Sequence, residues 1–140
     1  MIHAVVLACV LWQAAPTAPG GADADGLTPL MRAAARGDVK TVTTLVAGGA
    51  DVNATHAELR LSPLMFAAYF GHDAVIRVLL DAGARANGKD AAGASAADWA
   101  TAGDHAATTD TLTKAGAQLN PFLNVGVMPF ALMDKAAAPR

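Results

Sequence analysis

A five-residue phrase that occurs three times is the feature that most constrains the fold of this chain. The residues Gly-Ala-Asp-Val-Asn at 49–53 return as Gly-Ala-Arg-Ala-Asn at 83–87 and, in a weaker form, as Gly-Ala-Gln-Leu-Asn at 116–120. The leading glycines are 34 and then 33 residues apart. A fixed period of this length indicates a stacked repeat, because a unit of this size cannot bury its apolar face alone.

A second pattern precedes each copy of the phrase and predicts how a unit begins. It reads Thr-Pro-Leu-Met at 28–31, Ser-Pro-Leu-Met at 62–65 and, more weakly, Ser-Ala-Ala-Asp at 95–98. A hydroxyl residue can cap a helix with its side-chain oxygen, and proline is tolerated at the first helical position because its missing N–H would be unpaired anyway. We therefore expect a helix to begin after each of these openings.

Glycines then divide each unit into two helices. Gly37 is expected to end the first helix of the first unit, as Gly71 ends that of the second. A second helix is predicted over about 39–47, and Gly49 follows it where a left-handed C-cap needs no side chain.

Together these patterns resemble the ankyrin repeat over about residues 23–120. The resemblance implies an all-α fold, an ankyrin-repeat solenoid of about three helix-turn-helix units joined by β-turn loops, at 25–57, 58–90 and 91–120. The third unit is the least regular, since Asp104 replaces the glycine at its bend. It is expected either to present a polar end to water as a C-terminal cap or to be a degenerate copy without a function.

The family usually continues its opening motif with a histidine that bonds to the capping hydroxyl. Met31, Met65 and Asp98 take that place here. The resemblance therefore implies a stack that is less rigid than a consensus ankyrin domain.

Composition limits both the core and the partners. Apolar residues make up 54% of the chain but aromatic residues only 5%, and 35 of the 140 residues are alanine. This predicts an interior of closely approaching helices with small contact residues. The formal net charge of −2 and the pI of about 6.0, without a basic stripe, argue against binding of nucleic acid.

The N-terminus predicts export. Residues 4–12 are uncharged and apolar, too short to span a bilayer but suited to the core of a secretory signal peptide at 1–18, with a linker at 19–24. We expect a periplasmic or secreted bacterial protein; the alternative is a cytoplasmic chain whose apolar run packs on the repeats or follows a mis-assigned start. Association with a membrane is expected only if Cys9 is acylated, since the run also resembles a lipoprotein signal.

The chain lacks the common catalytic and metal-binding motifs, and we predict that it is not an enzyme and needs no cofactor, metal or small-molecule substrate. His72 and His105 hold equivalent places beside Asp73 and Asp104. The resemblance explains them as bend residues, and a metal or acid–base site is the alternative. His56 lies in the first inter-repeat turn and has no histidine or cysteine partner at a matching spacing.

The predicted function is noncatalytic binding of another protein, of unknown identity, in the ankyrin groove. In this family the groove consists of the projecting turns and the exposed side of each first helix. Exposed aromatic residues beside an arginine are typical of interface hot spots. Carried over to this sequence, the resemblance places the following residues in the partner-binding set: Arg36, Leu59, Arg60, Leu61, Tyr69 and Phe70.

Residues 121–140 form an apolar tail outside the repeats, with Pro121 and Pro129 preventing one continuous helix. We expect the tail to cover the exposed end of the third unit. Alternatively it docks a partner or begins further sequence. If it docks, the chain is an accessory subunit that stabilises an exported enzyme.

Overall fold

The computed structural model describes residues 21–123 and 129–138, and it contains helices and turns but no strand in those ranges. The predicted signal peptide at 1–18, including Cys9, lies outside the described residues. The seven helices follow in this order: α2 (Pro29–Arg36), α3 (Val39–Ala47), α4 (Pro63–Tyr69), α5 (Asp73–Asp81), α6 (Ala96–Ala102), α7 (Ala106–Lys114) and α8 (Phe130–Ala137).

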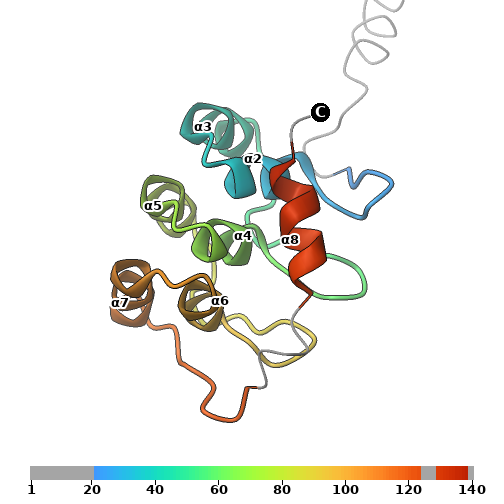
Figure 1. Cartoon of the computed structure of the whole chain (residues 1–140). Coiled ribbons are helices and arrows are strands. Elements are labelled where there is room, and N and C mark those ends of the chain that lie inside the picture. Colours follow the sequence, from blue (N-terminus) through green and yellow to red (C-terminus); the bar gives the residue numbers. More distant parts are fainter. Residues whose placement is uncertain (1–20, 124–128, 139–140) are drawn as a thin grey trace, which may run out of the picture.

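Six of these helices form two parallel rows. The inner row is α2, α4 and α6, and the outer row is α3, α5 and α7, with each outer helix packed on the inner helix of its own unit (Figure 1). The predicted fold class, an all-α ankyrin-repeat solenoid of three helix pairs, is confirmed. The predicted second helix of the first unit, over about 39–47, coincides with α3.

Small residues line the contacts within the inner row. Ala33 and Ala34 on α2, Ala67 and Ala68 on α4, and Ala97 on α6 are all buried. Because an alanine side chain ends at Cβ, neighbouring inner helices can approach closely with few voids. The alanine-rich composition is thus used where successive units meet.

Each inner helix begins with a reciprocal capping box. The hydroxyl of the N-cap residue accepts a hydrogen bond from the backbone N–H three residues later, and the side chain of that later residue accepts one from the N-cap N–H. The pairs are Thr28 with Met31, Ser62 with Met65, and Ser95 with Asp98. The two thioethers and one carboxylate therefore complete the cap at the place where the family usually has histidine.

The third unit keeps its packing despite its polar sequence. Thr108 is buried in α7, and its hydroxyl donates a 2.7 Å hydrogen bond to Asp73 at the start of α5. Asp104 adopts φ +62°, a left-handed conformation that aspartate tolerates better than most residues. This hydrogen bond links the outer helices α5 and α7.

The turn before α2 begins within the predicted linker at 19–24. Asp23 already belongs to the first repeat turn, because its N–H donates to the carbonyl of Leu27 as His56 does to Leu61 and Asp90 to Ala94. The three turns therefore close with the same kind of hydrogen bond, although the second turn is one residue longer.

The C-terminal tail takes a different place from the one expected. Its helix α8 packs on α2 and α4, and it lies on the side of the inner row that faces away from the outer helices (Figure 1). We expected the tail at the far end of the third unit, but the expectation was wrong for α8, since Met133 and Ala136 are fully buried against the inner row instead.

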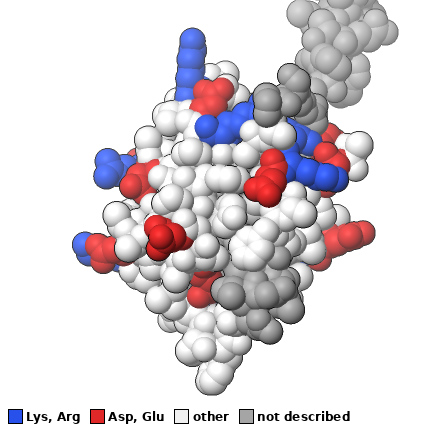
Figure 2. Space-filling view, in the orientation of Figure 1, with Lys and Arg blue, Asp and Glu red and all other residues white. Residues whose placement is uncertain are grey.

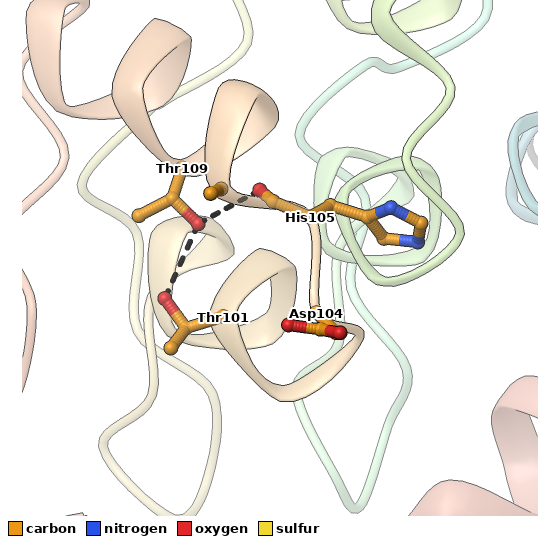
Figure 3. A pocket seen from close by; sticks show the side chains of 5 residues that line it. Thr101, Asp104, His105 and Thr109 are labelled. Carbon is orange, nitrogen blue, oxygen red and sulfur yellow. Dashed lines mark hydrogen bonds between the residues drawn. The ribbon is translucent and has the colours of Figure 1, made fainter.

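The rings of His72 and His105 pack against glycines of the preceding unit. A Cβ added to Gly37 would lie 2.6 Å from Nδ1 of His72, and one added to Gly71 would lie 2.6 Å from Nδ1 of His105. Nε2 of His72 also lies 3.0 Å from the carbonyl oxygen of Ala35. Figure 3 shows the His105 ring directed away from the side chains of Thr101 and Thr109.

Substitution of Gly71 by alanine should destabilise the stack more than substitution of Gly49. Both glycines have positive φ, +71° and +91°, but a Cβ at Gly49 would meet nothing within 4 Å. We expect Gly49→Ala to lower the free energy of unfolding by roughly 1–2 kcal/mol through backbone strain alone. Gly71→Ala should lose more, because the His105 ring must also move. Urea unfolding followed by circular dichroism measures both, and equal losses would show that the histidine contact is unimportant.

Candidate partner-binding site

The candidate site is the concave face, which we define as the side of α2, α4 and α6 turned away from the outer helices, together with the turns that precede them. Helix α8 lies on this face (Figure 1). It runs from an aromatic cluster at its N-terminal end to a pair of arginines at its C-terminal end.

The aromatic cluster joins three helices. The ring of Tyr69 on α4 lies 4.9 Å from that of Phe70, 5.8 Å from Trp99 on α6 and 5.6 Å from Phe130 on α8, measured between centroids. The rings of Trp99 and Phe130 are 5.7 Å apart and nearly perpendicular. Edge-to-face pairs at such distances add to the free energy of simple burial. Phe130 is therefore the anchor of α8 at this end.

Arg32 and Arg36 on α2 hold the other end of α8. Nη1 of Arg32 donates to the carbonyl oxygen of Lys135 at 3.1 Å, and Nη2 of Arg36 donates to that of Ala138 at 3.0 Å. The last carbonyls of a helix lack partners inside the helix and carry the negative end of its dipole. Two guanidinium groups at this point supply hydrogen-bond donors to the carbonyls and positive charge to the negative end of the dipole.

Arg32 is itself positioned by two carboxylates from the first turn. Its Nε donates to Asp23 and its Nη2 to Asp25 at 3.0 Å. Lys135 of α8 also lies 3.5 Å from Asp25. The turn, α2 and α8 thus share one small ionic network.

This network perturbs two pKa values. Partial burial acts to raise the pKa of Asp23, but hydrogen bonds from Arg32 and from the N–H groups of Leu27 and Asp25 outweigh it and lower the pKa below its usual value. The hydrogen bond to Asp23 correspondingly raises the pKa of Arg32. Both groups are held in their charged forms at neutral pH.

Two of the six predicted partner-binding residues contact the α8 segment, and a third lies beside one of them. Arg36 is exposed and bonds to Ala138, while Tyr69 is half-buried against Phe130. Phe70 is half-buried and stacks on His72, with ring centroids 6.1 Å apart, so it is shared between the surface and the contact between units.

The other three predicted residues belong to the second turn. Leu59 is half-buried, and its carbonyl accepts a 3.0 Å hydrogen bond from Ala91 of the next turn. Arg60 is exposed and has φ +56°. Leu61 is 0% exposed, so its assignment to the binding surface was wrong and it is a core residue. The reason is that this turn folds back on itself, with the N–H of His56 bonded to the Leu61 carbonyl.

Sequence reasoning missed Arg32 and Trp99, although the repeat held the signal. Both residues occupy the same place in their units, with Phe66 in the second, and each bonds to an aspartate nine residues earlier. In the third unit this is Nε1 of Trp99 donating to Asp90 at 2.9 Å. A side-by-side reading of the three units would have paired Arg32 with Asp23 in the same way.

His56 also has a structural role that we did not predict from the sequence. Its Nδ1 accepts from the N–H groups of Glu58 and Leu59, which leaves the proton on Nε2, 3.1 Å from the carbonyl oxygen of Asp25. His56 therefore plays the part that Asp23 and Asp90 play in their own turns, and it also links two turns.

A hollow of about 250 Å³ lies beside the bend of the third unit, lined by Thr101, Asp104, His105, Ala106 and Thr109. The hydroxyl oxygens of Thr101 and Thr109 are joined by a 3.2 Å hydrogen bond, and the Thr109 hydroxyl also donates to the carbonyl oxygen of His105 (Figure 3). The His105 ring points out of the hollow toward the second unit. Within residues 21–123 and 129–138, no three His, Cys, Asp or Glu side chains are grouped so that they could hold a metal ion.

Charges of both signs are mixed on the face that bears α8 (Figure 2). Figure 2 shows positive and negative side chains interspersed on the face that bears α8, with uncharged surface between them. No helix in the described part of the chain is long and apolar enough to cross a membrane.

Comparison with known proteins assigns the family. The family model for ankyrin repeats, in three copies, matches residues 30–122. The chain therefore belongs to the ankyrin-repeat family.

The chain is similar to parts of much longer proteins. It is 33% identical over 105 residues to the ankyrin repeat and KH domain-containing protein mask-1 of Caenorhabditis elegans, covering 74% of this chain and 4% of that protein. It is 42% identical over 65 residues to the probable E3 ubiquitin-protein ligase XBOS31 of Oryza sativa subsp. japonica, covering 46% of this chain and 15% of that protein. The crystal structure of the human ASB11 ankyrin repeat domain matches with a TM-score of 0.62 and 36% identity, over 66% of this chain and 41% of that chain.

The chain thus spans less than half the length of each of these proteins. They come from a nematode, rice and human, so they give no support to the bacterial source that we expected from the N-terminal sequence.

Acid should weaken the structure through Asp23. A carboxyl whose folded pKa is lowered stabilises the folded state above its unfolded pKa, here 3.8, and that stability is lost as pH falls through the folded value. We expect Asp23→Asn to lose roughly 1–2 kcal/mol of unfolding free energy at pH 7, because charged hydrogen bonds are lost. Unfolding curves at pH 7 and pH 2.5 test this. The difference between wild type and variant should shrink at the lower pH, and a difference independent of pH would contradict the role of Asp23.

Proposed function

We propose that the chain is a noncatalytic module that binds a partner protein on its concave face. The observation that carries this proposal is that the face accommodates a helix, α8, through an aromatic cluster and two arginine side chains. Aromatic residues and arginine are the residue types most enriched at interface hot spots. Membership of a family built on solenoid surfaces supports the same function.

The accessory-subunit alternative lacks support. It requires the apolar side chains of the tail to be available to an enzyme, but Met133 and Ala136 of α8 are buried within the chain itself, and Phe122 is the one large apolar side chain of the described tail that is exposed. Export, which we predict from the N-terminal sequence, stays a prediction.

Substitution of Tyr69 and Phe70 together by alanine should abolish partner capture while the helices stay intact. Both rings are half-buried at the edge of the core, so their removal takes away contact area and leaves the fully buried side chains in place. The measurement is affinity capture from an extract of the source organism with tagged wild-type and variant chains, followed by mass spectrometry of the bound proteins. Circular dichroism reports folding.

The control carries Val78→Ala with Leu80→Ala. These two residues are half-buried on the outer helix α5 of the same unit, so a similar apolar loss falls on the opposite side of the stack. The control should retain capture. The proposed function fails if the Tyr69 and Phe70 variant captures the same proteins in the same amounts as wild type.

A further inference from the structure

We propose that the concave face is a receptor for a short amphipathic helix, and that α8 is a resident ligand which a partner helix must displace. The inference rests on the proposed function and specifies the chemistry of its partner. The expected partner helix has an aromatic residue, an apolar residue three places later and a small residue three places after that. Phe130, Met133 and Ala136 have this spacing in α8.

The first argument is the contact surface of α8. Residues at intervals of three lie along one side of a helix. On that side Met133 and Ala136 are fully buried, and Phe130 meets the aromatic cluster. Ala131 and Asp134 are exposed on the other side. The concave face therefore contacts the residues on one side of the helix and places no requirement on the residues of the opposite side.

The second argument is the way in which the C-terminal end of α8 is recognised. Arg32 and Arg36 donate to the carbonyl oxygens of Lys135, in the last turn of α8, and of Ala138, the residue after the helix. The side chain of Lys135 adds a 3.5 Å ion pair with Asp25. Carbonyls at the end of any helix offer the same acceptors. This half of the receptor therefore binds the backbone at the end of a helix and one basic side chain, while the aromatic cluster at the other end binds an aromatic side chain.

The third argument is that α8 depends on the face more than the face depends on α8. A helix of eight residues is too short to be stable alone in water. Its N-cap residue, Pro129, makes no side-chain capping hydrogen bond, whereas α2, α4 and α6 each begin with a capping box. The units are joined to one another by their own helix contacts. A longer or better capped helix could therefore replace α8 and leave the stack in place.

The test releases α8 in the full-length chain and offers it back as a peptide. Met133→Asp places a charge on the buried stripe, and the matched control Ala131→Asp places the same charge on the exposed stripe. The probe is a fluorescein-labelled peptide with the sequence of residues 129–138, and fluorescence anisotropy measures its binding to wild type and to both variants.

Met133→Asp should bind the peptide saturably. Wild type and Ala131→Asp should bind it with an affinity lower by about tenfold or more, because their own α8 occupies the face. Addition of Arg36→Ala to Met133→Asp should weaken binding, and a peptide that carries the Met133→Asp change should not bind. Absence of saturable binding to a folded Met133→Asp chain, or equal binding by all three proteins, would overturn the proposal.

Two further readings complete the test. If Met133→Asp does not fold, Phe130→Ala takes its place, and failure of both to fold would overturn the proposal by making α8 part of the obligatory core. A wild-type dimer that becomes monomeric in Met133→Asp, measured by light scattering, would assign α8 to a second copy and overturn the intramolecular site. Failure of peptide binding, with partner capture still lost in the Tyr69 and Phe70 variant, would reject the inference and leave the proposed function standing.

Discussion

Close contact between the inner helices is the interaction on which the rest of the structure depends. Buried alanines at Ala33, Ala34, Ala67, Ala68 and Ala97 let α2, α4 and α6 pack side by side. This spacing brings the ring of His72 against Gly37 and that of His105 against Gly71, where any larger residue would collide. It also fixes the distance between equivalent turns, so that His56 can reach Asp25. A concave face with a defined shape follows from this regular stacking.

The same stacking assembles the two recognition elements from different units. Tyr69 and Trp99 meet because α4 and α6 are neighbours in the inner row. Arg32 and Arg36 lie together because they are four residues apart on α2. Neither element alone spans the length of α8. Together they receive both ends of a short helix, which is a property of the stack and not of a single repeat.

Much of the fold could be predicted from the sequence because its signals are local and repeated. The Thr-Pro and Ser-Pro pairs that begin helices and the glycines that end them act over a few residues. The period of 33 or 34 residues gives the number and sequence of the units. The binding surface was less predictable. Leu61 could not be recognised as buried, since its environment depends on how one turn folds back. The place of α8 depends on contacts between residues about a hundred positions apart, such as Arg32 with Lys135, and no local pattern encodes these.

The most direct test of this account is whether α8 lies on the concave face in solution. Nuclear Overhauser effects from the ring protons of Phe130 report this, because its ring lies within 6 Å of the rings of Tyr69 and Trp99, measured between centroids. The account predicts cross-peaks from Phe130 to both residues in the full-length chain. Assigned spectra in which Phe130 shows contacts to neither ring would contradict it.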